Sequence, residues 1–253
     1  MIPTLNNDTV FSLGLHRQET EIESYLAFVF YAQYQNTLNN IENILHENER
    51  RYFNNLKSER RRFSYLTGRF VAKLAICEYL HEIDMTQIEI TSGIFDQPIV
   101  KHLSFDTPSV TISHCSDLSI AIACQQGHIM GIDVEEIDFN KTHVFKSQLT
   151  DDEISKSESN FKDTRLGYNL IWTAKESLSK AIKCGLTVPF SVLEIDKIEH
   201  VSDNAYLSNY KNFAQYKCYS WFTDKHLISI TLPRKTETTL NIAGKIIALN
   251  AQF

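Results

Sequence analysis

Two stretches of the chain carry apolar residues at steps of three and four, the spacing that gives a helix one buried face. The first runs from about Ser58 to His81 and the second from about Arg165 to Cys184, where the following Gly185 suits a helix end. The apolar positions are Phe63, Leu66, Phe70, Leu74 and Cys77 in the first stretch and Ile171, Ala174, Leu178 and Ala181 in the second. A further helix is predicted before each long one, over 41–56 and 151–159.

Short extended segments surround these helices. Runs of aromatic and aliphatic residues without proline predict strands, at 10–15, 25–31, 109–114, 118–124, 130–135, 192–195, 218–222 and 226–232. Each half of the chain therefore combines a long helix with a small antiparallel sheet. The pattern predicts an α+β fold with an N-terminal half over 1–127 and a C-terminal half over 128–253. No repeat is visible residue by residue, so any duplication is expected in architecture only.

Composition narrows the possible classes of protein. The chain has 253 residues and a net charge of −6, which is not the basic surplus that non-specific nucleic-acid binding uses. No apolar run approaches the roughly 18 residues of a membrane span, and the first residues do not resemble a secretory signal. The five cysteines are scattered and form no CxxC pair, which argues against disulfides and a cysteine zinc site. We expect a cytoplasmic protein.

Two carboxylates stand two positions apart in the segment Gly131-Ile-Asp-Val-Glu135. On a strand, Asp133 and Glu135 point to one face while the apolar residues between them point to the other. Such a face could hold a hard cation. Taken alone, the spacing fits a charged solvent face better.

A third carboxylate lies on the second long helix. Glu176 and Lys180 are one turn apart and Lys175 is adjacent, a pattern that an ordinary ion pair would also explain. Together with Asp133 and Glu135, however, they match what Mg²⁺ with a bound diphosphate requires, namely few protein oxygens and nearby ammonium groups.

Further candidates for phosphate binding are less specific. Ser113 and His114 end a strand before a turn, where they could reach a phosphate, although His114 could equally be a residue at the edge of the core. Arg62, Arg69 and Lys73 lie along one stripe of the first long helix, which would also suit a solvated face.

The order of these motifs resembles the phosphopantetheinyl transferases of the surfactin-synthetase-activating (Sfp) type. The matching blocks are separated and together span about half of the chain. They are Leu66-Thr-Gly-Arg69, Ile112-Ser-His114, Gly131-Ile-Asp-Val-Glu135, Trp172-Thr-Ala-Lys-Glu-Ser-Leu-Ser-Lys-Ala181 and Gly185-Leu186. One departure is Gln97, which stands where the family's nucleotide loop usually has lysine.

This resemblance implies a pseudo-twofold pair of similar halves with coenzyme A in the cleft between them. It implies metal ligands at Asp133, Glu135 and Glu176. The coenzyme A contacts that it implies are Arg62, Arg69, Ser113, His114, Lys175 and Lys180, with a structural role as the alternative for Arg69. Glu153 is implied as the base that deprotonates the acceptor serine, with Asp152 as a competitor, and Lys180 as a second catalytic residue.

The expected activity is Mg²⁺-dependent transfer of 4′-phosphopantetheine from coenzyme A to a serine of an acyl, peptidyl or aryl carrier protein, with release of 3′,5′-ADP. We expect a monomer that binds neither nucleic acid nor membrane. Two other classes are weighed. A magnesium-dependent nuclease would also use clustered carboxylates and a lysine, but the net acidity disfavours it. A coenzyme A-binding or carrier-binding protein without activity would keep the site and lack transfer.

Overall fold

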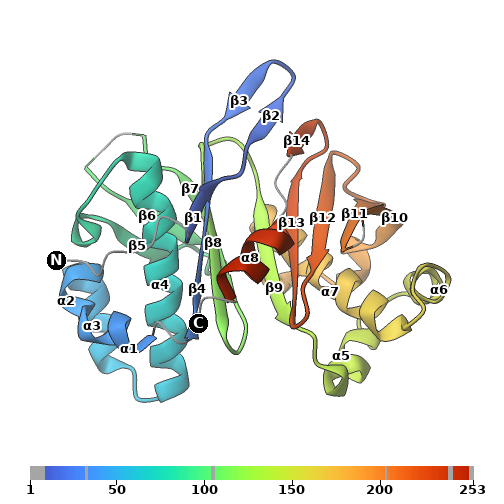
Figure 1. Cartoon of the computed structure of the whole chain (residues 1–253), viewed down its shortest axis with the longest axis horizontal. Coiled ribbons are helices and arrows are strands. Elements are labelled where there is room, and N and C mark those ends of the chain that lie inside the picture. The colour runs from blue at the N-terminus through green and yellow to red at the C-terminus, as the bar shows by residue number, and fades with distance from the viewer. Residues whose placement is uncertain (1–8, 32–33, 104–105, 203, 239–241, 251–253) are drawn as a thin grey trace. The chain divides into compact units, whose positions relative to one another are not determined.

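The computed structural model describes residues 9–31, 34–103, 106–202, 204–238 and 242–250, and the chain forms two compact units (Figure 1). The first unit comprises residues 1–128 with 237–240 and 248–253, and the second comprises 129–236 with 241–247. Both combine antiparallel strands with helices, so the predicted α+β class is confirmed.

The first unit is built on a four-stranded antiparallel sheet in the order β1-β4-β8-β7. The strands are β1 (Val10–Ser12), β4 (Ser24–Phe30), β7 (Ser109–His114) and β8 (Leu118–Cys124). The long helix α4 (Glu59–Leu80) packs on β4, β7 and β8 (Figure 1). Its apolar face joins a core that includes Leu66, Val71 and Ile76. The predicted helix over 58–81 is thus confirmed almost to the residue.

Smaller elements complete the first unit. The helices α1 (Tyr34–Asn39), α2 (Ile41–Ile44) and α3 (Glu47–Asn55) precede α4, and the 3₁₀ turn η2 (Met85–Gln87) follows it. The hairpin of β5 (Glu89–Ser92) and β6 (Pro98–Lys101) comes next. A separate three-stranded sheet has the order β14-β2-β3, from β2 (Leu15–Arg17), β3 (Thr20–Ile22) and β14 (Thr236–Thr238). A strand from near the C-terminus therefore completes a sheet that begins near the N-terminus.

The second unit has a five-stranded sheet in the order β10-β11-β12-β13-β9, antiparallel throughout. Its strands are β9 (Gly131–Glu136), β10 (Ile195–Ser202), β11 (Ala205–Tyr210), β12 (Tyr216–Phe222) and β13 (His226–Pro233). The long helix α7 (Thr164–Ala181) packs on β9, β12 and β13. Its buried face includes Leu170, Ala174 and Leu178. The apolar spacing predicts Ala174 and Leu178 on this face.

The remaining elements are short. They are η3 (Phe139–Lys141), α5 (Thr142–Lys146), α6 (Asp151–Asn160), η4 (Gly185–Thr187), η5 (Phe190–Leu193) and α8 (Ile242–Asn250). Among the described residues, none of the helices combines the length and the apolar character that a bilayer crossing requires. The five cysteines are free thiols, as predicted.

The single helix predicted over 41–56 is wrong, because the chain breaks it at Leu45 and His46. Leu45 is fully buried in an extended conformation, and His46 starts α3 as its N-cap. The His46 ring accepts a hydrogen bond from the Asn48 amide, and the His46 amide donates to Glu49 at 2.9 Å. This reciprocal cap stabilises a new helix start, which periodicity alone does not reveal. The strand predicted at 192–195 is also wrong, since η5 occupies most of it and β10 begins at Ile195.

A buried ion pair follows this cap in the first unit. Glu49 is the third residue of α3, and its carboxylate binds the ammonium group of Lys73 on α4 at 2.5 Å. Its Oε1 accepts the amide proton of Ile90 at 3.0 Å, where β5 runs. Lys73 also donates to the carbonyl oxygen of Ile44 at 2.8 Å. Lys73 is fully buried, so the predicted basic stripe on α4 is not a solvated face at this position.

The second unit contains the same arrangement. Glu153 is the third residue of α6, and its carboxylate binds the ammonium group of Lys175 on α7 at 2.5 Å. Its Oε1 accepts the amide proton of Ile195 at 2.9 Å, and Lys175 also donates to the carbonyl oxygen of Gln148 at 3.4 Å. Ile44 and Gln148 each lie two residues before their helix cap. The two units therefore share a capped helix, a buried Glu–Lys pair and a strand amide in equivalent positions.

Candidate active site

Strand β9 and helix α7 bring the predicted metal ligands together in the second unit. Asp133 and Glu135 point from β9 toward α7, as the two-residue period predicts, while Ile132 and Val134 are buried. Gly131 lets the two elements approach closely. A Cβ atom at Gly131 would lie only 1.9 Å from the carbonyl oxygen of Ser177 on α7. The glycine at the start of this motif thus sets the spacing between strand and helix.

Side chains of α7 hold both carboxylates of β9. The Lys180 ammonium group binds Asp133 Oδ1 at 2.7 Å, and the Trp172 indole N–H donates to Glu135 Oε1 at 3.2 Å. The Trp172 ring stacks on Phe190 with ring centroids 4.8 Å apart, and it also contacts Phe145. The Trp172 ring is held by these contacts, and its N–H orients Glu135. The sequence motif alone does not predict this role for a tryptophan.

The charged forms of Glu135 and Glu176 are disfavoured in this site. Burial raises the pKa of Glu135, and the neighbouring Asp133 raises it further. The pKa of Glu176 rises to about 7, first because of burial and then because of Asp133 and Glu135. Lys180 opposes this rise without cancelling it. The group carries more negative charge than its lysine neutralises.

This donor set fits a small divalent cation. Carboxylate oxygens are the ligands that Mg²⁺ prefers, and a cation would relieve the mutual repulsion of Asp133, Glu135 and Glu176. In the described structure their oxygens do not all lie within 4.8 Å of one another, and Lys180 occupies one side of Asp133.

Two predicted site residues of this unit lie away from that carboxylate group. Glu153 and Lys175 are both 0 % exposed and are bound to each other. Glu153 Oε2 also accepts the amide proton of Thr150 at 2.9 Å. A base for an incoming serine needs a free oxygen within reach of that serine. The pair joins α6 to α7 in this structure, and the roles of Glu153 as a base and of Lys175 as a phosphate contact stay predictions.

The sequence contains a signal for this structural role. Thr150 and Glu153 form the S/T-x-x-E pattern of a capping box, and the Thr150 hydroxyl accepts the Glu153 amide proton at 3.2 Å. The competitor Asp152 is exposed and forms an ion pair with Lys156. The hydrogen bond from Lys156 lowers the pKa of Asp152, and burial opposes this only in part.

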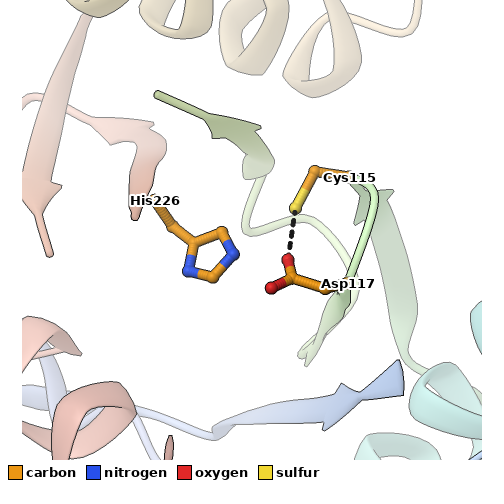
Figure 2. A group of neighbouring side chains, drawn as sticks. All are labelled: Cys115, Asp117 and His226. Carbon is orange, nitrogen blue, oxygen red and sulfur yellow. Dashed lines mark hydrogen bonds between the residues drawn. The ribbon is translucent and has the colours of Figure 1, made fainter. Parts of the chain in front are cut away.

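Residues predicted to bind nucleotide phosphates lie in the first unit. Ser113 and His114 end β7, where Ser113 is buried and His114 is exposed. The turn that follows is closed by a hydrogen bond from the Cys115 thiol to the Asp117 carboxylate at 3.7 Å (Figure 2). His226, also drawn there, begins β13 of the second unit. The structure thus places the Ser-His pair at a strand end, as predicted, and its role in phosphate binding stays a prediction.

The arginines of α4 have protein partners. Arg69 lies 3.3 Å from Glu49 Oε1 and over the ring of Tyr65, so its surroundings are those of a structural residue. Arg62 lies in the first turn of α4 with its guanidinium group 4.1 Å from the centre of the Phe53 ring. Arg62 is partly exposed, and its predicted contact with the 3′-phosphate stays a prediction.

Gln97, which replaces the usual lysine of the nucleotide loop, closes the turn between β5 and β6. Its side-chain oxygen accepts the amide proton of Phe95 at 2.9 Å, and its backbone oxygen accepts that of Gly93 at 2.8 Å. The amide side chain therefore serves the turn itself in this chain.

Comparison with known proteins finds one matching family. Residues 129–243 match the sequence model of the 4′-phosphopantetheinyl transferase superfamily. No curated protein matches the chain.

Several solved structures match part of this chain. A holo-(acyl-carrier-protein) synthase from Bacillus anthracis, solved in complex with CoA (3′,5′-ADP), is 22% identical; the match covers 45% of this chain and 96% of that one, with a TM-score of 0.37. The holo-ACP synthase of Plasmodium yoelii is 17% identical over 46% of this chain and 95% of that one, with a TM-score of 0.36. The enzyme from Thermotoga maritima is 21% identical over 49% and 70%, with a TM-score of 0.32.

The matched segment contains Asp133, Glu135 and Glu176 together with both predicted lysines. The segment over residues 129–243 is thus similar in sequence to the 4′-phosphopantetheinyl transferase superfamily.

Proposed function

We propose that this protein transfers the 4′-phosphopantetheine arm of coenzyme A to a serine of an acyl, peptidyl or aryl carrier protein, as an Sfp-type transferase. The observation that carries the proposal is the convergence of Asp133, Glu135 and Glu176 from β9 and α7, with Lys180 beside them, inside the segment that matches the family.

In this proposal Asp133, Glu135 and Glu176 would hold Mg²⁺, which when bound would supply positive charge beside the diphosphate of coenzyme A. Trp172 keeps Glu135 pointed at the site through its indole N–H. Lys180, which is 28 % exposed, moves from Asp133 to the phosphate that leaves and neutralises part of its charge.

The reaction is a single displacement at phosphorus. The serine oxygen forms a bond to the phosphorus that bears pantetheine, the bond from that phosphorus to the bridging oxygen breaks, and 3′,5′-ADP leaves with the electron pair. The serine proton passes to solvent water, since Glu153 is buried and bound to Lys175. Positioning and charge stabilisation then account for the rate, and the chain needs no nucleophile of its own.

The test is intact-mass spectrometry of apo carrier proteins of the acyl, peptidyl and aryl types after incubation with the protein, coenzyme A and Mg²⁺. A mass gain of one phosphopantetheine group is expected on at least one type, and it should be lost with Asp133→Ala. Binding of coenzyme A without a mass gain on any carrier would reject the transferase and leave a coenzyme A-binding protein.

A further inference from the structure

Lys175 anchors α7 beside the metal ligand Glu176. Its side chain is fully buried, its ammonium group binds Glu153 Oε2 at 2.5 Å, and it lies over the ring of Phe190 at 5.9 Å. Glu153 is fixed in turn, because its two oxygens accept the amide protons of Ile195 and Thr150. A helix held at one side chain by such a contact cannot easily rotate or slide at that position.

The residue that follows Glu176 is anchored as well. The Ser177 hydroxyl lies 2.6 Å from the hydroxyl of Thr231 on β13, and Thr231 in turn bonds Tyr210 at 2.6 Å. Tyr210 also donates to the carbonyl oxygen of Ala174 at 2.8 Å. Glu176 therefore lies between two buried neighbours with fixed partners, and the direction of its side chain follows from theirs.

We propose that the Glu153–Lys175 pair positions Glu176 for metal binding and touches neither coenzyme A nor the acceptor serine. The inference rests on the proposed function, because it assigns the pair a purpose at the same metal site. It replaces the two roles that the family resemblance implies, a base at Glu153 and a phosphate contact at Lys175, both of which require groups that solvent can reach.

The first unit supplies a matched control. Glu49 and Lys73 form the same buried pair at the same 2.5 Å, with the same kind of cap and the same strand amide. The residue after Lys73 is Leu74, where the second unit has Glu176. Removal of either lysine disrupts an equivalent scaffold, but only one scaffold adjoins a predicted metal ligand.

The experiment compares Lys175→Met with Lys73→Met in the full-length chain. Thermal unfolding should show a lowered midpoint for both variants, with the larger fall for Lys175→Met, because Glu49 still has Arg69 at 3.3 Å after Lys73 is removed. Mn²⁺ binding, followed by electron paramagnetic resonance at a temperature where both are folded, should weaken about tenfold for Lys175→Met and stay within about twofold for Lys73→Met. If Lys175→Met does not fold, Glu153→Gln/Lys175→Met, which removes both charges, is compared with Glu49→Gln/Lys73→Met in the same way.

Steady-state kinetics separate positioning from direct contact. Saturating Mg²⁺ should restore most of the rate of the Lys175 variant, and the KM for coenzyme A should then match that of the wild type. A rate defect that Mg²⁺ cannot correct, or a KM for coenzyme A that stays high, would overturn the inference in favour of direct contact. Equal Mn²⁺ affinity of the wild type and the Lys175 variant would overturn it in favour of a role in folding alone. A wild type that binds no Mn²⁺ would instead refute the proposed metal site, and the inference with it.

Discussion

At the scale of single residues, the charged form of Glu176 is the most disfavoured among the three carboxylates of the site. Its pKa is raised to about 7 by burial and by two neighbouring carboxylates. Glu176→Gln removes that charge and keeps the shape of the side chain. The free energy of unfolding of the metal-free protein should therefore increase by about 1–3 kcal/mol, while transfer is lost.

Urea unfolding with excess chelator checks this first expectation, with Glu158→Gln on the exposed part of α6 as the control. Glu158→Gln should leave both stability and transfer unchanged. A less stable Glu176→Gln protein would contradict the repulsion inferred for the three carboxylates.

Local periodicity predicted the placement of Asp133, Glu135 and Lys180 better than it predicted the contact between Glu153 and Lys175. Alternation on a strand places Asp133 and Glu135 on one face, and helical spacing places Lys180 one turn after Glu176, so local periodicity suffices. The pairing of Glu153 with Lys175 spans 22 positions and depends on how α6 packs on α7. No local pattern contains that information. The capping box at Thr150 does, however, indicate that Glu153 stabilises a helix start.

At the scale of elements, the contact between β9 and α7 depends on the absence of a side chain at Gly131. A methyl group there would meet backbone atoms of Ser177 and Ala181, which cannot turn away. Gly131→Ala should lower the free energy of unfolding by about 2–3 kcal/mol and move Glu176 away from Asp133. Chemical denaturation and Mn²⁺ affinity both report this change, and an unchanged affinity would show that the strand-to-helix spacing does not matter for the metal.

The opposite result is expected for a glycine in the interior of α4. The nearest atom to a Cβ at Gly68 is a methyl carbon of Ile112 at 3.7 Å, an ordinary contact. Gly68→Ala should therefore stabilise the protein by about 0.5–1 kcal/mol, since alanine restricts the unfolded chain and favours helix. A loss of stability on denaturant unfolding would mean that the helix approaches its sheet more closely than the structure shows.

Element boundaries show where sequence reasoning succeeds. The long helices α4 and α7 repeat their apolar residues over five turns or more, so their existence was predicted well. The three-residue strands β2, β3 and β14 are too short to show any period, and their pairing joins residues more than 200 positions apart. Such a sheet is specified by tertiary contacts, which lie outside any local window.

At the scale of the whole molecule, the chain passes from its second unit back to its first at residue 237. Residues 237–240 belong to the first unit, and the Thr238 hydroxyl donates to the carbonyl oxygen of Leu13 at 2.8 Å. Thr238→Val keeps the shape of this side chain and removes the donor, so the free energy of unfolding should fall by about 1 kcal/mol.

Hydrogen exchange gives the sharper readout of this last contact. Amides of β2 should exchange faster in Thr238→Val, whereas Thr20→Val, at an exposed position of β3, should leave them unchanged. Equal exchange in both variants would mean that β14 contributes nothing to the sheet of β2 and β3.

The buried Glu–Lys pair occurs in both units, but only the second unit also has the predicted metal ligands. A comparison of the two units therefore separates residues that stabilise the fold from residues that serve the reaction. The first unit keeps the buried pair, the helix cap and the strand amide, yet β4 presents Ser-Tyr-Leu-Ala-Phe-Val-Phe where β9 presents its two carboxylates. The first unit could therefore serve in protein engineering as a copy of the scaffold that lacks the two strand carboxylates. Acidic residues could be introduced there with Glu49 and Lys73 left in place. Such variants would show how few substitutions a structural domain needs in order to bind a metal ion.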